Sequence, residues 1–329
     1  MRLSEFDFGL PKELIAQKPT IPRDHARLLV YSRKNGKITD DYFYNLDKYL
    51  EPATTLVLND SKVEKSRLRF GPVEIFVLEV LNPTTIRALV RPGKRFRLGQ
   101  ESSLPLLQGP PLKILTIDID DEGIRTLSLS LPIDDKRLDS HRLTPLPPYI
   151  AQDESLSSQY QTVYAKPLGS KAAPTAGLHF TKKQLEQLSH KHRIVKLTLH
   201  VGLGTFAPVK SEDISRHKMH SEEYLMSESA AATLNDAKHI TAVGTTSLRV
   251  LESVGKPFKE TAGATNIFIT PGYQFSTVDS LITNFHLPKS TLLMLVAAMT
   301  GLEQMHHIYQ HAISNKYRFY SFGDATLIL

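Results

Sequence analysis

Short segments with an apolar residue at every second position follow one another between residues 67 and 149. They read VEIFVLEVL, TIRALV, LKILTIDI and GIRTLSLSL, and turn residues such as Asn-Pro, Pro-Gly and Gly-Pro-Pro separate them. This alternation is typical of antiparallel strands. Because no convincing helical pattern interrupts the segments, we predict an inserted all-β domain over residues 67–149, a small barrel or a sandwich.

The flanking parts of the chain show a different pattern. Continuous apolar runs predict strands buried on both faces, and helical segments separate these runs after residue 170. The runs read ARLLVYS and TTLVLND before the insert, and RIVKLTLH, ITAV, NIFIT, LITNFH and YSFGDATLIL after it. The alternation predicts an α/β domain, with a mostly parallel sheet covered by helices on both faces. This domain comprises residues 1–66 and 150–329.

Local signals place the ends of the predicted helices. Thr181 and Gln184 form a capping-box pattern, so a helix begins at Thr181. Gly244–Ser247 opens a second helix, which Gly255 ends. The segment STLLMLVAAM predicts a third helix, with Gly301 at its end.

Glycine and polar residues gather where the predicted strands end. The carboxyl ends of parallel strands meet at one edge of a sheet, so we expect these turns to form a ligand crevice. Asn59 and Asp60 also follow a buried strand, and a plain turn is the alternative there. The five turns are residues 200–206, 244–247, 271–273, 284–286 and 323–324.

Composition restricts the classes of function. The chain has no cysteine, which excludes disulfides and thiolate chemistry and removes the commonest structural ligand of zinc. It opens without the apolar core of a signal peptide, and its longest apolar run, residues 292–299, is too short to cross a bilayer. We therefore expect a cytoplasmic protein without membrane association. The net charge of +6 suits an anionic partner such as RNA, although many proteins without one share it.

Histidines and glutamates cluster near residue 220. His217 and His220 are spaced by one helical turn, and Glu222 and Glu223 follow them. This set could bind a divalent metal, but acid–base catalysis by His220 with Glu222 or Glu223 fits the residues better. A solvated turn is the plain alternative. The chain has no dinucleotide fingerprint, Walker loop, HExxH or GxSxG, so nicotinamide, ATP and serine-hydrolase chemistry lack their motifs.

Two turns and one loop suggest ligand contacts. Gly202 and Gly204, with Phe206, would let a planar ligand lie along the backbone, and Gly244–Ser247 resembles an anion cradle. The loop Arg91–Arg97 carries four cations around one aromatic residue, which could hold phosphates and stack on a base. A plain turn, an ordinary helix cap and a solvated hairpin tip are the alternatives. The residues thus indicate an α/β enzyme that binds a small anionic ligand, with RNA as a further candidate.

Long and specific blocks extend from the first residues of the chain to the last. They include PRDHARLLV, LVLNDSKV, LPPYI, YQTVYAKPLGSKAAPTAGLHFT, LHVGLGTFAPV, HKMHSEEY, AVGTTSLRVLES, IFITPGYQF, VDSLITNFHLPKSTLLMLVAA and YRFYSFGDA. In these blocks the chain resembles the S-adenosylmethionine:tRNA ribosyltransferase-isomerases of queuosine biosynthesis.

The resemblance implies a reaction. Such enzymes transfer the ribosyl part of S-adenosylmethionine to 7-aminomethyl-7-deazaguanine at the wobble position of tRNAs with a GUN anticodon. The ribosyl unit rearranges, epoxyqueuosine forms, and adenine and methionine are released. S-adenosylmethionine is thus a consumed substrate, and neither a cofactor nor a metal is expected. The family fold is an α/β domain with an inserted β-barrel, and we expect a monomer.

The resemblance also implies site residues. The candidates for proton transfer are His179, His200, His220 and Glu222. Phe206 and Tyr273 would face the sulfonium by cation–π attraction, and Arg249 with the Gly244–Ser247 turn would hold the methionine carboxylate. The other candidates for substrate binding are Asp60, Thr175, Gly177, Gly202, Gly204, Thr205, Thr245, Thr246, Asn284, His286 and Lys289. The candidates for RNA binding are Arg91, Lys94, Arg95 and Arg97.

The chain departs from the family pattern at two places. The insert is compact, because GPVEIF follows Arg67-Leu68 almost directly where relatives carry a longer basic hairpin. Ser158-Gln159 stands where the family commonly has an acid–arginine pair. Two other functions stay open: an S-adenosylmethionine-dependent RNA methyltransferase, which would release S-adenosylhomocysteine, and a non-catalytic tRNA-binding protein.

Overall fold

A computed structural model describes residues 1–202, 209 and 211–329 of the chain. The described chain divides into two compact units, residues 1–62 with 146–329, and residues 63–145. Both boundaries lie a few residues before the predicted ones. The first unit is thus discontinuous in sequence, and each unit has a sheet and a hydrophobic core of its own.

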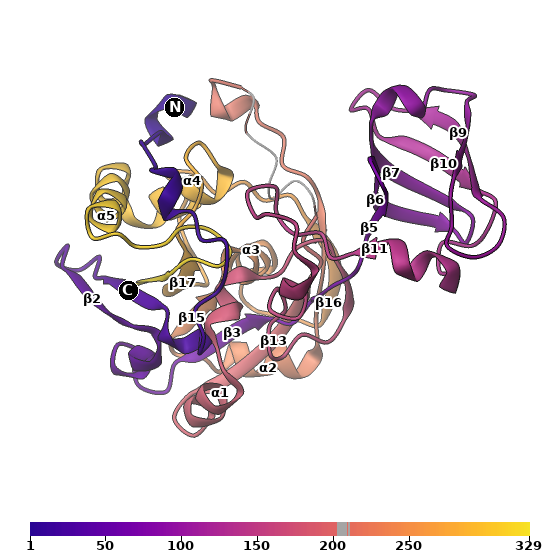
Figure 1. Ribbon diagram of the computed structural model, residues 1–329. Helices are drawn as coiled ribbons and strands as arrows, with labels where there is room; N and C mark the ends of the chain where they lie inside the picture. Colours follow the sequence, from indigo (N-terminus) through magenta and orange to yellow (C-terminus); the bar gives the residue numbers. More distant parts are fainter. Residues whose placement is uncertain (203–208, 210) are drawn as a thin grey trace. The chain divides into compact units, whose positions relative to one another are not determined.

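A nine-stranded sheet forms the centre of the first unit within the described residues (Figure 1). Its strand order is β16-β14-β13-β3-β15-β17-β18-β1-β2. A separate two-stranded sheet pairs β4 (Lys62–Val63) with β12 (Leu168–Ser170). The strands of the large sheet are β1 (Arg27–Tyr31), β2 (Ile38–Tyr42), β3 (Thr55–Asn59), β13 (Arg193–Leu199), β14 (Glu222–Met226), β15 (Ile240–Val243), β16 (Thr261–Thr265), β17 (Ser280–Asn284) and β18 (Ala325–Ile328).

The sheet is mixed, and the prediction of a mostly parallel sheet is wrong. The pairs β13–β3, β3–β15, β15–β17 and β18–β1 are parallel. The pairs β1–β2, β17–β18, β13–β14 and β14–β16 are antiparallel. Apolar runs report that a strand is buried, but they carry no information on its direction.

The segment NIFIT is not a strand, contrary to its pattern. Residues 266–270 have no strand assignment, and the strand β16 comes directly before them. Ile269 is buried in the core, and Ile267 and Phe268 pack against it. The three apolar side chains are thus covered without backbone pairing, which is why the hydrophobic pattern alone suggested a strand.

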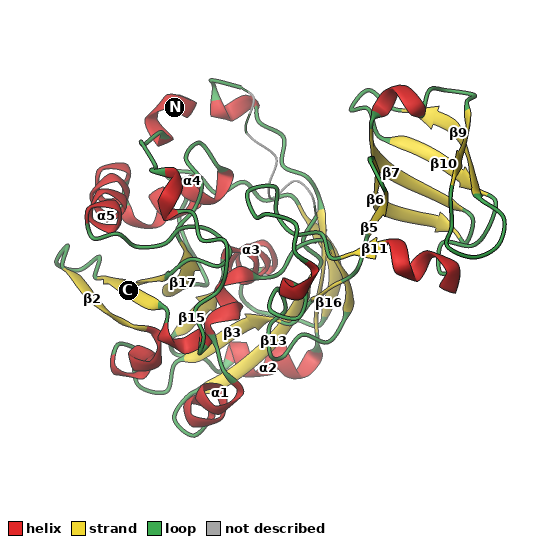
Figure 2. Ribbon diagram, in the orientation of Figure 1, coloured by secondary structure: helices red, strands yellow, loops and turns green. Residues whose placement is uncertain are grey.

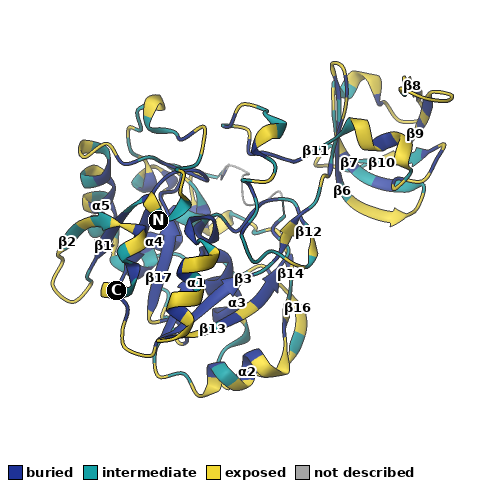
Figure 3. Ribbon diagram, turned by 60° about the horizontal axis from the view of Figure 1, so that its bottom comes forward, coloured by how far each residue is buried: buried dark blue, intermediate teal, exposed yellow. Residues whose placement is uncertain are grey.

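Helices cover both faces of the nine-stranded sheet (Figure 2). Alternate residues of β3 separate the two faces: Val57 belongs to one core cluster, and Leu56 and Leu58 belong to the other. Figure 3 shows β3 as a buried strand. Side chains of α2, α3, α4 and α5 fill the Val57 cluster, and Leu188 of α1 lies in the other. The helices are α1 (Lys182–Ser189), α2 (Glu228–Asn235), α3 (Thr245–Val254), α4 (Thr291–Thr300) and α5 (Leu302–Ser314).

The helix α1 begins where its sequence predicts. The hydroxyl of Thr181 accepts a hydrogen bond from the backbone N–H of Gln184 at 3.1 Å. The side chain of Gln184 does not return to Thr181; it donates to the carbonyl of Phe43 at 2.8 Å. Thr181 therefore caps the helix as the capping box predicts, whereas Gln184 bonds the helix to a distant segment of the chain.

The second unit is built around a seven-stranded antiparallel sheet of order β11-β5-β6-β7-β10-β9-β8. The sheet is curled (Figure 1), and its strands and the segments between them supply the core side chains of the unit. The sheet stays open, because β11 and β8 are its two edges, so the predicted barrel is an incomplete one. The strands are β5 (Arg67–Phe70), β6 (Val73–Asn82), β7 (Thr85–Arg91), β8 (Glu101–Leu104), β9 (Leu112–Ile119), β10 (Arg125–Leu129) and β11 (Arg142–Leu143).

Phe96 lies in the core of this second unit. Its side chain has 0% exposure, so the prediction that it stacks on an RNA base is wrong. Arg91, Lys94, Arg95 and Arg97 are all exposed, and the side chain of Arg95 also donates to the carbonyl of Ser103 at 3.0 Å. The loop between β7 and β8 therefore presents cations to solvent and holds its aromatic ring inside.

We expect Phe96→Ala to lower the free energy of unfolding of the second unit by about 3–5 kcal/mol, because the substitution empties a filled core site. Leu98→Ala is the matched control, since Leu98 is 65% exposed and its loss should change stability by about 0.5 kcal/mol or less. Denaturant unfolding of the full chain measures both. Equal effects of the two substitutions would contradict the placement of Phe96.

Candidate active site

The carboxyl ends of four parallel strands meet at one edge of the large sheet. These strands are the neighbours β13, β3, β15 and β17. The turn Gly323-Asp324 reaches the same edge for a different reason, because β18 is antiparallel to β17 and its Ala325 pairs with Asn284. The turn at residues 271–273 follows no strand. Four of the five predicted turns thus belong to this edge.

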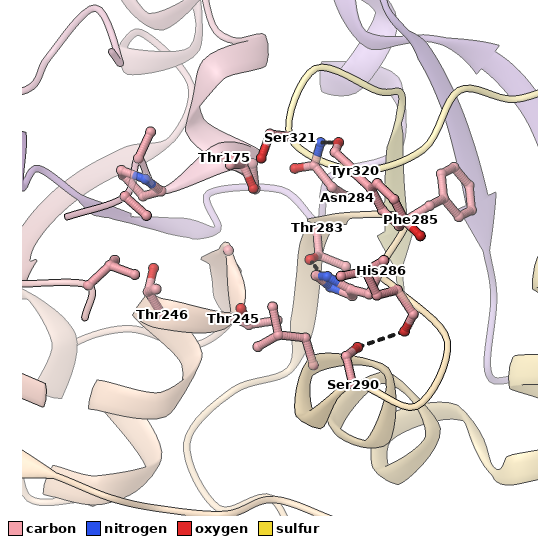
Figure 4. Close-up of a pocket in the computed structure, with 18 of the residues that line it drawn as sticks. Thr175, Thr245, Thr246, Thr283, Asn284, Phe285, His286, Ser290, Tyr320 and Ser321 are labelled. Carbon is pink, nitrogen blue, oxygen red and sulfur yellow. Dashed lines mark hydrogen bonds between the residues drawn. The ribbon is translucent and has the colours of Figure 1, made fainter. Parts of the chain in front are cut away.

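A pocket opens at this edge (Figure 4). It contains six of the residues predicted from sequence: Thr175, Gly244, Thr245, Thr246, Asn284 and His286. Polar residues that were not predicted complete it, although they stand in the blocks LPPYI, TNFHLPKS and YSFGD. These are Tyr149, Thr283, Ser290, Tyr320 and Ser321.

The helix α3 begins at the wall of the pocket. Gly244 precedes it with φ +88°, a backbone conformation that favours glycine, and no side chain of the described residues caps the helix. The hydroxyl of Ser247 donates to the carbonyl of Val243 at 2.9 Å and so turns back toward the strand. The hydroxyl of Thr246 is buried and has no hydrogen-bond partner among the described residues.

Asn284 stands at the end of β17, across the pocket from this helix. Its amide nitrogen donates to Nε2 of His179 at 3.2 Å and to the carbonyl of Tyr320 at 3.0 Å. Its amide oxygen is buried and finds no partner within the described chain. Burial lowers the pKa of His179 to about 3, so its imidazole is neutral at pH 7 and Nε2 accepts.

His286 is a second buried, neutral imidazole. Its Nε2 lies 2.8 Å from the hydroxyl of Thr283, and burial lowers its pKa to about 3. Its backbone N–H donates to the hydroxyl of Tyr309 at 2.9 Å. His286 lines the pocket, whereas His179 supports Asn284 from behind the pocket wall.

A buried ion pair lies beside the pocket. The carboxylate of Glu222 at the start of β14 contacts the guanidinium of Arg249 on α3, and both residues are 4% exposed. Glu222 also accepts the backbone N–H of Gly202 at 2.8 Å. Nε and Nη2 of Arg249 have no partner in the part of the chain that the structure describes. The pair joins β14, α3 and the turn after β13.

Comparison with known proteins assigns the family. The sequence model of a family described as "Queuosine biosynthesis protein" matches residues 3–328. The chain belongs to the queuosine biosynthesis protein family. The resemblance seen in the sequence is therefore confirmed.

Two curated relatives of this family member are named S-adenosylmethionine:tRNA ribosyltransferase-isomerase. That of Clostridium kluyveri is 46% identical over 343 residues, and that of Halothermothrix orenii is 46% identical over 345 residues; each alignment covers 100% of both chains. A crystal structure of S-adenosylmethionine tRNA ribosyltransferase from Thermotoga maritima has a TM-score of 0.57 and 35% identity. The superposition covers 99% of this chain and 100% of the Thermotoga maritima chain.

The remaining histidines predicted for this family member occupy different surroundings. His200 follows β13, its ring lies against Gly169, and its buried Nδ1 has no partner among the described residues. His220 is exposed, and burial followed by the charge of His220 lowers the pKa of His217. Within the described residues, no three His, Asp or Glu side chains are grouped so that they could hold a metal ion.

Asp60 and Gly177 are close to Tyr164. The carboxylate of Asp60 accepts the hydroxyl of Thr198 at 2.7 Å, and burial raises its pKa. A Cβ added at Gly177 would lie 2.0 Å from the hydroxyl oxygen of Tyr164, so glycine is required there by space. Neither Asp60 nor Gly177 lines the pocket.

Tyr273 and Lys289 are engaged away from the pocket lining. The hydroxyl of Tyr273 donates to Glu252 at 3.1 Å, and Nζ of Lys289 lies 2.7 Å from the carboxylate of Asp7. The predicted residues Gly204, Thr205 and Phe206 lie outside the described residues.

We expect Glu222→Gln to lower the free energy of unfolding by about 3–5 kcal/mol, because it leaves the buried guanidinium of Arg249 without its counter-charge. Glu223→Gln removes the neighbouring carboxylate, which is exposed, and should change stability by about 0.5 kcal/mol or less. Combining Glu222→Gln with Arg249→Met should recover much of the loss, since the buried charge is then gone. Denaturant unfolding measures all three, and equal effects of the two glutamine substitutions would refute the argument.

We expect stability to fall as the pH decreases from about 6.5 toward 3. In this window unfolded histidine binds a proton, whereas buried His179 and His286, with pKa values lowered to about 3, do not. Each histidine should contribute a slope of roughly 1.4 kcal/mol per pH unit to the free energy of unfolding. His286→Gln should remove one such contribution, and His190→Gln, on the surface, should remove none. Unfolding curves at several pH values would reject the assignment if both variants keep the wild-type slope.

Proposed function

We propose that this chain transfers and isomerises the ribosyl moiety of S-adenosylmethionine onto 7-aminomethyl-7-deazaguanine in tRNA. Epoxyqueuosine forms, and adenine and methionine leave. The observation that carries this proposal is 46% identity, over the full length of both chains, to two proteins named S-adenosylmethionine:tRNA ribosyltransferase-isomerase. The pocket at the strand ends supports it, because it combines polar groups with an apolar wall as small-ligand sites do.

The chemistry requires proton transfers. A base takes a proton from the ribose carbon beside the sulfonium, an acid assists the departure of adenine, and the aminomethyl group loses a proton before it attacks. Imidazole suits such steps because its charge changes near neutral pH. We assign these roles to His200 and His220. His179 is less suitable because its ring is buried and neutral, and Glu222 is less suitable because its carboxylate is paired with Arg249.

The other groups have binding roles in this proposal. S-adenosylmethionine is consumed as a substrate, and the reaction uses no cofactor and no metal. Phe206 and Tyr273 are the candidates for the sulfonium, and Asp60 and Lys289 are further candidates for substrate contact. The exposed cations Arg91, Lys94, Arg95 and Arg97 would contact tRNA phosphates.

The proposal extends to partners and place of action. The tRNA carries a GUN anticodon, and the chain acts as a monomer in the cytoplasm. Among the described residues, the helices are all too short or too polar to cross a bilayer.

We expect the full-length protein to release adenine and methionine when it is incubated with S-adenosylmethionine and tRNA that carries the modified base. His200→Ala and His220→Ala should each lower the rate by roughly 10²–10⁴-fold, because each removes a proton-transfer group, while tRNA binding is retained. His190→Ala is the matched control and should keep the wild-type rate, since it replaces an exposed histidine of the surface.

The same assay separates the alternatives. Release of S-adenosylhomocysteine instead of adenine would indicate a methyltransferase. Binding of tRNA without any turnover would indicate a binding protein. Wild-type rates in both histidine variants would leave the reaction in place but refute the assignment of the proton carriers.

A further inference from the structure

Two buried polar groups face the pocket without a protein partner. They are the hydroxyl of Thr246, in a residue 8% exposed, and the amide oxygen of Asn284, in a residue 2% exposed. Among the described residues, neither group has a hydrogen-bond partner. A buried polar group without a hydrogen bond destabilises a protein by about 1–3 kcal/mol, so such groups in a pocket indicate a ligand that supplies the bond.

The orientation of Asn284 follows from its neighbours. Its amide nitrogen donates both to Nε2 of His179 and to the carbonyl of Tyr320, and the neutral imidazole can accept that bond. The amide oxygen must therefore point the other way, and Figure 4 shows it facing the side of the pocket where Thr175 and Ser321 lie. This wall of the pocket presents a hydrogen-bond acceptor.

The opposite wall presents donors and positive potential. The first backbone N–H groups of α3, at Thr245, Thr246 and Ser247, precede the first intrahelical bond, which Leu248 makes to Gly244. Among the described residues, no side chain caps this end of the ten-residue helix. A helix N-terminus with free N–H groups favours an anion, and the hydroxyl of Thr246 adds one more donor beside them.

A pocket lined by an acceptor at one place and by a cluster of donors at another is complementary to a zwitterion. In S-adenosylmethionine the α-carboxylate is the anion, and the α-ammonium is bonded to the same carbon. The cavity measures about 70 Å³, which is room for a few water-sized groups and fits an amino-acid end better than a nucleoside. Ala172, Ala173 and Val201 give it small apolar walls.

Arg249 does not belong to this pocket. It is absent from the lining, and its charge is already matched by Glu222. The backbone N–H groups of α3 are therefore better candidates than Arg249 for binding the methionine carboxylate.

We propose that the pocket binds the methionine end of S-adenosylmethionine: the N–H groups at the start of α3 and the Thr246 hydroxyl hold the α-carboxylate, and the Asn284 amide oxygen holds the α-ammonium. His179 is a positioning residue that fixes the Asn284 amide. The assignment rests on the proposed function for the identity of the ligand.

The test uses the full-length protein with tRNA present and three ligands: S-adenosylmethionine, its deaminated analogue and its decarboxylated analogue. Binding is measured by calorimetry, and adenine release is measured in parallel. Asn284→Ala should lower the affinity for S-adenosylmethionine by about 10- to 100-fold, which corresponds to the loss of a hydrogen bond to a charged group. The same substitution should leave the affinity for the deaminated analogue unchanged. Thr246→Val should weaken S-adenosylmethionine and leave the decarboxylated analogue unchanged.

Thr233→Val is the matched control, because it removes a half-buried helix hydroxyl, bonded to the carbonyl of Ser229, elsewhere in the same unit. If a variant weakens all three ligands alike while remaining folded, the assignment of the pocket is overturned and the reaction stands. If the variants raise the KM for tRNA alone, the pocket holds a phosphate, and the assignment is likewise wrong. If Asn284→Ala does not fold, Thr246→Val decides by itself. If wild-type protein binds the three ligands as expected but releases no adenine, the proposed function fails and the pocket assignment survives.

Discussion

The burial of four adjacent parallel strands determines where this protein can place chemistry. β13, β3, β15 and β17 lie in the middle of the sheet, and helices or connecting segments cover both faces. A polar group buried on such a strand loses its hydrogen bonds to water, which favours the strand ends as the place for functional polar groups. Because the four strands run in the same direction, those ends form one edge. The pocket and the turns around it follow from this constraint.

One helix links the parts of the site. The start of α3 faces the pocket with uncapped N–H groups, and Arg249 in its middle pairs with Glu222. In its last turn Glu252 accepts the backbone N–H groups of Ser276, Thr277 and Val278. These bonds stabilise a carboxylate at a helix end that would otherwise disfavour it. A shift of α3 would thus disturb the pocket wall, the ion pair and the segment after Tyr273 together.

The second unit shows how a basic loop can be read wrongly. Four cations around Phe96 suggested a surface that grips phosphates and stacks on a base. The structure keeps the cations near solvent but buries the ring, because the ring fills part of the core of a small unit. Phosphate contact by Arg91, Lys94, Arg95 and Arg97 stays a prediction, and any stacking on an RNA base must come from another residue.

The sequence by itself determined most of the strands, the starts of α1 and α3, and the gathering of chemistry at strand ends. These features depend on residues that are close together along the chain. Periodicity indicates burial, Thr181 and Gly244 indicate where helices begin, and the family blocks indicate the reaction. Only the tertiary structure decided the direction of the strands and the core position of Phe96. It also paired Glu222 with Arg249, 27 residues away, and turned the amide oxygen of Asn284 into the pocket through His179, 105 residues away. Such choices depend on partners that are distant along the chain, and a local pattern of residues carries no information about which partners will meet.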